Sequence, residues 1–215
     1  MKVFIFASAR RFALGLREMK KSRTRAAIEA AAVSCLTETG YRGMKMSDVA
    51  RMAEVAVGTL YNYFPSKAAL VSAVTQLQVM EALERSQDLL DHGVSCPADA
   101  LLPPLGEVIR MMSDFGKALM REVFSASMRA AGDELGREMM KADMMVVSAL
   151  AERAGKLQTR GMLGTAHSPD KIALLVYSTA MGLILMYIFD DDLEVEWLLA
   201  EVDLAVTALL RGLNE

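Results

Sequence analysis

The chain contains few of the residues on which metalloproteins, disulfide-bonded proteins and most hydrolases depend. Its 215 residues include only two cysteines and two histidines. Cys35 and Cys96 are widely separated and lack the spacing of metal ligands, which favours a protein kept in a reducing compartment such as the cytoplasm. His92 and His167 fall in expected loops, and no Ser/His/Asp, paired-carboxylate or phosphate-loop motif accompanies them. We therefore expect neither an enzyme nor a metal or other cofactor.

Runs of alternating β-branched residues between turn clusters, which would indicate strands, are also missing. Prolines number five and aromatic residues make up 6%, whereas 53% of the chain is hydrophobic and 17 residues are methionine. Apolar residues recur at helical spacing instead, as in the stripe of Ile28, Ala31, Ala32, Cys35 and Leu36. The sequence predicts an all-α protein with enough residues for a sizeable core in one or two domains.

The chain has little net charge, −3, but that charge is unevenly distributed. Residues 1–70 contain 12 Lys and Arg against five Asp and Glu, whereas the remainder contains 12 against 22. A basic N-terminal part followed by an acidic remainder indicates that a polyanion binds residues 1–70 alone. The alternative at this point is an ordinary imbalance among solvated side chains.

Three segments near the N-terminus have the pattern of a helix-turn-helix unit. Helices are expected over 22–39, where Gly40 ends the first, over 47–53 and over 57–64. A longer fourth helix follows, with Ser66 as its cap.

The third of these helices is too short to be stable alone, so its neighbours must hold it. At about 100° per residue, Leu60 and Phe64 fall on one side of it, while Thr59 and Asn62 fall on the other. Pro65 ends the helix because it restricts the preceding residue and lacks a donor. A polar face held outward in this way is the design of a helix that reads DNA.

A helix with such a face fits the major groove, where base edges carry a full hydrogen-bond code. Asn62 would bind adenine through N6 and N7, and Thr59 would contact a base through its hydroxyl or methyl group. Neighbouring side chains would hold phosphates. The residues expected at DNA on these grounds are Lys45, Ser47, Arg51, Gly58, Thr59, Tyr61, Asn62, Tyr63 and Lys67, with Lys20, Lys21, Arg23 and Arg25 adding non-specific attraction. The alternatives are a solvated polar face for Thr59 and Asn62, and a place at the core edge for the tyrosines.

These motifs also carry a family resemblance. With Thr39-Gly40-Tyr41, Ser47-Asp48-Val49-Ala50 and above all the run VGTLYNYFPSKAAL over 57–70, the segment 25–70 resembles the TetR family of bacterial transcriptional regulators. The resemblance implies a dimer with two-fold symmetry built from the last two helices, and a variable ligand pocket in the C-terminal part. It also implies DNA contacts at Ser47, Val57, Gly58, Thr59, Tyr61, Tyr63 and Lys67.

Two residues in the turn before the third helix depart from the family pattern. Family members commonly have Gly where this chain has Glu54, and Ser or Thr where it has Ala56. Glu54 must then adopt a turn geometry that Gly usually supplies. Ala56 lacks the hydroxyl of an N-cap worth about 1 kcal/mol. Thr or Ser is also favoured near Met44 and Lys45.

The chain divides into three expected parts. Residues 1–22 form a basic extension, either disordered or preceding a natural start near Met19; residues 23–68 form the helix-turn-helix domain; and residues 69–215 form an effector-binding and dimerisation domain. Prolines 97, 103 and 104 mark the entry to a helical bundle. Helices are expected there near 105–115, 117–128, 133–157, from 168 onward and over 195–213, which makes about nine helices in the chain.

The uncharged run Ile172–Phe189 is at the lower limit of transmembrane length. We prefer a helix buried on two sides, by its own bundle and by a partner subunit, because Asp190–Asp192 follow it without a basic cluster. The final helix carries two apolar seams, so both helices are expected in a four-helix interface of a homodimer. The interface residues expected are Leu175, Thr179, Gly182, Met186, Leu198, Val202, Ala205 and Leu209. The alternatives are internal core helices and, more remotely, association with a membrane.

Methionine and aromatic residues gather in the middle helices of the bundle. Methionine adapts to irregular apolar ligands, which suits a hydrophobic effector. The residues expected to line its pocket are Met111, Met112, Phe115, Met120, Phe124, Met128, Met144 and Tyr177, with Met139, Met140 and Met145 in the same cluster. Asp143, Arg121 and Tyr177 are candidate polar anchors. The alternative is that these residues form ordinary core.

The leading hypothesis is a cytoplasmic, ligand-responsive DNA-binding repressor that binds a palindromic operator as a homodimer. A small effector in the bundle would release the repressor from DNA. The fourth helix would transmit the change from the effector site to the DNA-binding surface. The alternatives are a transcriptional activator, a regulator without a small ligand, and a membrane-associated helical protein.

Overall fold

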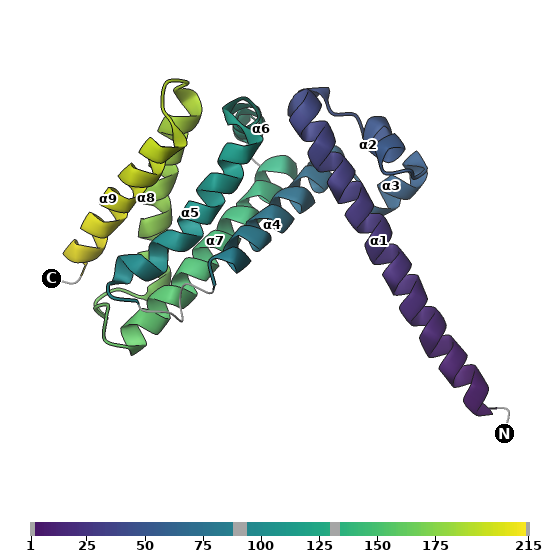
Figure 1. The fold of residues 1–215 in the computed structure, drawn as a ribbon, viewed down its shortest axis with the longest axis horizontal. Coiled ribbons are helices and arrows are strands. Elements are labelled where there is room, and N and C mark those ends of the chain that lie inside the picture. The colour runs from purple at the N-terminus through teal and green to yellow at the C-terminus, as the bar shows by residue number, and fades with distance from the viewer. Residues whose placement is uncertain (1–2, 88–93, 130–133, 214–215) are drawn as a thin grey trace. The chain divides into compact units, whose positions relative to one another are not determined.

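The computed structural model describes the backbone of residues 3–87, 94–129 and 134–213, and their side chains from Glu18 onward except at position 129. Within these ranges the chain forms nine helices and no strand, which confirms the all-α class (Figure 1). Two compact units divide between Val74 and Thr75, inside the fourth helix. The functional boundary that the sequence analysis sets at residue 68 stays a prediction.

The first unit contains α1 (Val3–Gly43), α2 (Met46–Met52), α3 (Val57–Tyr63) and the beginning of α4 (Lys67–Arg85). The predicted apolar stripe of α1 is buried throughout, Cys35 included, and so are apolar residues of the next three helices. Those residues are Val49, Ala50, Leu60, Leu70, Val71 and Val74. The helix-turn-helix expected from the sequence is therefore present, and its core is apolar.

Helix α1 differs from the prediction at its start. It begins at Val3, not near Ser22. The physical reason is the composition of this segment, which lacks proline and contains several Ala, Arg, Leu and Lys residues, all good helix formers. The separation of residues 1–22 as an extension stays a prediction. Gly40 interrupts the helical dihedrals as predicted, with φ 70° and ψ 176°, before a last turn reaches Gly43.

The second unit contains the rest of α4 with α5 (Pro97–Phe115), α6 (Lys117–Arg129), α7 (Glu134–Thr159), α8 (Pro169–Phe189) and α9 (Val195–Gly212). Helix α8 packs along α7 and α9, and α5 also packs on α7 and α9 (Figure 1). Their facing stripes make one continuous core that includes Leu101, Leu150 and Val176. Ser168 caps α8 through the Lys171 amide, as expected.

The sequence analysis misplaced the start of α5. The helix begins at Pro97 and continues through Pro103 and Pro104, eight residues before the expected start at 105. Its first turn is fixed by Asp99, whose carboxylate accepts the Ser95 and Cys96 amides at 2.8 and 2.9 Å. Pro97 occupies the first helical position, where no N–H is needed. The two later prolines are tolerated in a stretch whose neighbours Leu101 and Leu105 are buried.

Helix α8 is apolar on all sides, but only one side of it is buried. Ile172, Val176, Ala180 and Ile184 face the core, whereas Leu174, Met186 and Phe189 are exposed. By length and composition it is the single described helix that could cross a membrane, a test that core helices of soluble proteins also pass. Its exposed apolar face is the surface that the sequence analysis expects a second subunit to cover.

Candidate nucleic-acid interface and ligand-binding region

Helix α3 is held as the sequence analysis predicts. Leu60 and Phe64 are buried beneath it, and the short helix packs on α2. Gly58, Tyr61 and Asn62 are exposed, with 47% of Tyr61 accessible. Thr59 and Tyr63 are partly buried. The helix thus presents a continuous polar and aromatic surface of the size that enters a major groove.

The turn into α3 is strained at the predicted position. Glu54 has φ 54°, the one positive φ among non-glycine residues in the described ranges. The turn closes through the Val55 amide, which donates to the Ala50 carbonyl at 2.9 Å. A left-handed conformation costs a residue with a Cβ about 1 kcal/mol. Ala56 is the N-cap of α3 and makes no side-chain bond, so the predicted loss of a cap is confirmed.

Arg25 contributes to this surface in a way that the sequence analysis missed. Its guanidinium lies 4.9 Å from the centre of the Phe64 ring and also donates to Glu29 at 2.8 Å. Phe64 is the C-cap residue of α3. Arg25 therefore supports the end of the recognition helix, and its charge is shared with a carboxylate. The expectation that it serves only as a non-specific attractor for a polyanion is incomplete.

Lys67 lies in the first turn of α4, as predicted, beside the cap formed by Ser66 and the Ala69 amide at 3.0 Å. Its ammonium donates to the Arg42 carbonyl at 3.3 Å and lies 4.6 Å from the centre of the Tyr41 ring. The Arg42 carbonyl belongs to the last turn of α1, where helical carbonyls lack intrahelical partners. A phosphate at the start of α4 would therefore find an ammonium already positioned.

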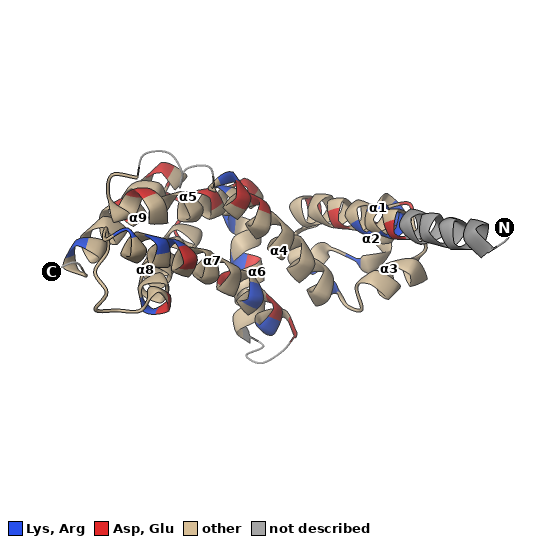
Figure 2. Ribbon diagram, turned by 90° about the horizontal axis from the view of Figure 1, so that it is seen from below, with Lys and Arg blue, Asp and Glu red and all other residues tan. Residues whose placement is uncertain are grey.

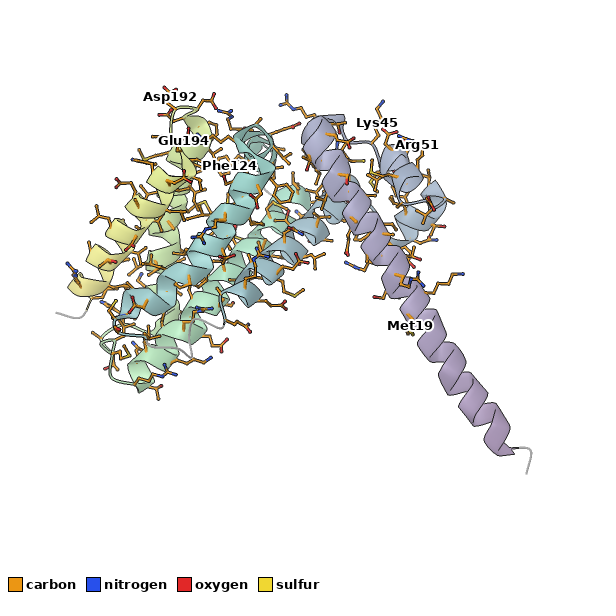
Figure 3. All side chains as sticks on the ribbon, in the orientation of Figure 1. Met19, Lys45, Arg51, Phe124, Asp192 and Glu194 are labelled. Carbon is orange, nitrogen blue, oxygen red and sulfur yellow. The ribbon has the colours of Figure 1, made fainter. Side chains whose placement is uncertain are left out.

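The other predicted contacts lie on and beside α2. Lys45 is the N-cap residue of α2, and Lys45, Ser47 and Arg51 are exposed. Arg51 approaches Asp48 at 3.7 Å, an exposed pair that leaves it mobile enough to reach a phosphate. Figure 3 shows Lys45 and Arg51 projecting outward from the α2 end of the first unit. Lys20, Lys21 and Arg23 are exposed at the start of the described side chains of α1. Figure 2 shows the basic residues in blue along the described part of the chain.

The residues expected to line an effector pocket are not equally enclosed. Met111 is buried, and Met112, Phe115, Met120 and Phe124 are partly buried on α5 and α6. Met128 and Met144, by contrast, are 65% and 43% exposed. An enclosed lining does not fit those two, because their positions on α6 and α7 face away from the core. Phe124 meets Phe189 of α8 edge to face, with ring centres 6.0 Å apart.

Two of the three candidate polar anchors lie together. The Tyr177 hydroxyl of α8 donates to the Asp143 carboxylate of α7. Burial raises the pKa of Asp143 above its usual value, and the bond from Tyr177 offsets part of that shift. Burial and the neighbouring carboxylate raise the pKa of Tyr177 as well. Arg121 is engaged elsewhere, because it pairs with Asp191 at 2.8 Å.

The expected dimer interface needs correction at two residues. Leu198 and Val202 are buried in the core of their own chain, so they have no surface to offer a second copy. The inward stripe of α9 is Leu198, Val202, Val206 and Leu210, which combines residues of both seams read from the sequence. Leu204, absent from the expected set, is 67% exposed. Leu175, Thr179, Gly182, Met186, Ala205 and Leu209 are exposed or partly exposed.

Known proteins resemble the first unit in sequence and most of the chain in fold. The model of bacterial regulatory proteins of the tetR family matches residues 28–74. The transcriptional repressor KstR of Mycolicibacterium smegmatis is 32% identical over 145 residues, which are 65% of this chain and 68% of that protein. KstR of Rhodococcus jostii is 29% identical over 67% of this chain, and the chain spans 62% of its length.

Solved structures agree in fold. A protein of Mesorhizobium loti described as a TetR-family transcriptional regulator superposes with a TM-score of 0.70 at 21% identity, over 89% of this chain and 96% of its own. The transcriptional regulator FadR of Bacillus subtilis, solved in complex with stearoyl-CoA, has a TM-score of 0.66 at 17% identity, over 87% and 98%. The sequence match and the shared helical fold lead to one conclusion: the chain belongs to the TetR family of bacterial regulatory proteins.

Proposed function

We propose that this chain is a transcriptional repressor of the bacterial cytoplasm that binds a palindromic operator as a homodimer. The observation that carries the proposal is α3, whose buried Leu60 and Phe64 hold an exposed face containing Tyr61 and Asn62. Asn62 pairs with adenine, while Tyr61, Tyr63 and Lys67 hold phosphates on both sides of the groove. Val57, Gly58 and Thr59 approach the bases from the first turn of α3, and Lys45 and Ser47 hold the backbone from α2.

The apolar surface that α8 and α9 leave uncovered supports the position that we propose for the second subunit. Leu174, Met186 and Phe189 of α8 and Leu204 of α9 are exposed, and no charged residue interrupts α8 between Lys171 and Asp190. A two-fold axis at this face pairs α8 and α9 with their copies in a four-helix arrangement. Thr179 and Gly182 let the helices approach closely, with Leu175, Ala205 and Leu209 at the edges.

The effector in this proposal is a small, mainly apolar molecule bound in the second unit. Met111, Met112, Phe115, Met120 and Phe124 supply adaptable apolar contacts. Asp143 and Tyr177 supply a polar end. The stearoyl-CoA bound by FadR, a protein of the same fold, carries a long acyl chain, and this supports an effector with an apolar part. Binding shifts the population toward a dimer in which the two copies of α3 no longer match successive grooves, about 34–36 Å apart.

A gel-shift titration tests the proposal directly. The full chain is titrated against DNA from upstream of its own gene at several salt concentrations, with an unrelated duplex of equal length as the control. We expect tighter binding to the upstream DNA and a steep loss of affinity with salt, because several phosphates are neutralised. Adding long-chain acyl-CoA to the complex tests the class of effector separately. Equal affinity for both duplexes would contradict a role in operator recognition.

A transcriptional activator with the same DNA-binding surface is the second candidate. The same upstream DNA, placed before a reporter gene, separates the two. Deletion of the chain raises expression if it represses and lowers expression if it activates.

A further inference from the structure

A proline inside α5 leaves one buried carbonyl without its helical partner. In an α-helix the carbonyl of residue 100 accepts the N–H of residue 104. Residue 104 is Pro, which has no N–H, so the carbonyl of Ala100 has no donor in its own helix. Ala100 is fully buried, and water therefore cannot satisfy the oxygen. A buried carbonyl in this position requires a donor from another element.

Arg153 of α7 is that donor. Its Nη1 donates to the Ala100 carbonyl at 3.0 Å, and its Nη2 donates to the Ser86 carbonyl at 3.0 Å and to the Ser86 Oγ at 2.8 Å. The residue is only 4% exposed. In the described ranges no carboxylate pairs with this guanidinium; Glu152 beside it is bound to Lys156 at 2.7 Å. A buried cation is thus held by carbonyl and hydroxyl oxygens alone.

The geometry joins three helices at one side chain. Ser86 directly follows α4, where the negative end of the helix dipole favours a cation. Ala100 lies in the first turns of α5, and Arg153 itself lies in α7. A second, exposed tie joins the same end of α4 to α5, because Arg85 pairs with Glu107 at 2.9 Å. The planar guanidinium fork fixes all three backbones with a geometry that lysine cannot reproduce.

We propose that Arg153 is the positioning residue that passes a movement of α5 against α7 to the C-terminal end of α4. The inference rests on the proposed function. Helix α5 carries Met111, Met112 and Phe115, and α7 carries Asp143, so a ligand among these residues alters the packing of the two helices. Helix α4 runs from Lys67 to Arg85, and α3 ends at Tyr63, shortly before it begins. In this proposal a change at Ser86 passes along α4 toward the recognition surface.

Arg153 supplies the hydrogen-bond donor that Pro104 lacks, so a second substitution at position 104 can compensate for the loss of Arg153. Arg153→Met removes all the donors and leaves the Ala100 and Ser86 carbonyls unpaired, which we expect to lower Tm by about 5–10 °C. Pro104→Ala restores a main-chain N–H to Ala100 and should recover about half of that loss in the double variant. Lys156→Met, an exposed substitution in the same helix, is the control and should leave Tm unchanged. Equal losses with and without Pro104→Ala would overturn the assignment of Arg153 as the donor to Ala100.

Transmission is tested by amide hydrogen exchange with the full chain, free and bound to DNA that the wild-type protein selects from a random pool. In the wild type, DNA binding changes the protection of the last turn of α4 and of α5, because coupling between sites is reciprocal. The Pro104→Ala, Arg153→Met double variant should bind the same DNA within about threefold while at least half of that change is lost. If both proteins show the same change, Arg153 is not the transmitter although the proposed function stands. If the wild type selects no DNA, the proposed function fails and transmission fails with it.

Discussion

The guanidinium of Arg25 lies 4.9 Å from the centre of the Phe64 ring, so a residue of the first helix supports the end of the recognition helix. Phe64 is buried beneath Arg25 and caps α3. Arg25 also pairs with Glu29 at 2.8 Å, so its charge is shared with a carboxylate. The contact makes the placement of the end of α3 depend on a residue that is distant from it in sequence.

Replacing Arg25 should therefore weaken DNA binding by misplacing α3. We expect Arg25→Ala to lower affinity about two- to fivefold, the size of an exposed cation–π contact, with little change in the salt dependence. Lys20→Ala, which removes an exposed charge from the same helix, should instead reduce the slope of log affinity against log salt by about one. Fluorescence anisotropy titrations at four salt concentrations measure both quantities. A salt slope reduced equally by both substitutions would show that Arg25 acts as a phosphate contact.

The strained turn at Glu54 predicts a stabilising substitution. Glu54→Gly removes the clash of a Cβ at φ 54° and should raise the free energy of unfolding by about 1 kcal/mol. Ala53→Gly is the matched control, because Ala53 has φ −79° and gains only chain entropy in the unfolded state. It should lower the free energy of unfolding by about 0.5–1 kcal/mol. Urea denaturation of the three proteins gives these differences, and a loss of stability in Glu54→Gly would contradict the strain.

Asp143 predicts a pH dependence of stability with a definite sign. Burial raises its pKa in the folded protein, so the unfolded chain loses this proton at lower pH than the folded chain does. The contribution of Asp143 to stability is therefore complete below the unfolded pKa of about 3.9 and is lost as pH rises through its raised folded pKa. Asp143→Asn keeps an acceptor for the Tyr177 hydroxyl and removes this titration. The variant should gain stability relative to the wild type as pH rises above the unfolded pKa of about 3.9.

Tyr177→Phe gives the complementary measurement. The hydroxyl bond lowers the pKa of Asp143, and its removal should therefore extend the loss of stability to higher pH. Thermal denaturation followed by circular dichroism across this pH range compares the three proteins. Parallel curves for the wild type and Asp143→Asn would show that Asp143 titrates with the same pKa in the folded and unfolded chain.

The exposed face of α8 and α9 predicts a single residue whose substitution disrupts the dimer. Leu204 is 67% exposed on α9, and Leu204→Glu places a charge at the proposed interface without altering the core. We expect the variant to sediment as a monomer at concentrations where the wild type is a dimer. Met140 is an exposed residue of α7, outside the proposed interface, and Met140→Glu should leave the dimer intact. Identical sedimentation of all three proteins would place the interface elsewhere.

The sequence predicted the elements with strong local signals and missed those set by tertiary packing. Leu60, Phe64, Gly40 and the cap at Ser66 are specified by spacing and by local conformational preference, and the structure confirms each. The start of α5 was missed because Pro103 and Pro104 normally exclude a helix. The Ala100 carbonyl, which Pro104 leaves without a donor in its own helix, is satisfied by Arg153, and Arg153 is distant in sequence.

The interface residues on α9 illustrate the same limit. Leu198, Val202, Ala205 and Leu209 share helical spacing, but spacing alone does not say which of two apolar seams faces the chain's own core. The contacts of α9 with α5 and α8 decide this, and they bury Leu198 and Val202. The supporting role of Arg25 was hidden for a related reason, since its partner Phe64 is distant in sequence. A basic residue within the basic N-terminal part suggests phosphate binding as long as its side-chain partner in the fold is not known.

The most direct test of DNA reading by α3 is selection of bound duplexes from a random pool by the wild type and by Asn62→Ala. The account predicts that the wild type enriches a palindrome whose half-sites lie about one helical turn apart. Asn62→Ala should enrich the same palindrome with the preference for one base pair in each half-site lost. Tyr61→Phe, which removes a phosphate contact, should weaken binding and keep every preference. Recovery of no common sequence by the wild type, or of an unaltered preference by Asn62→Ala, would contradict the account.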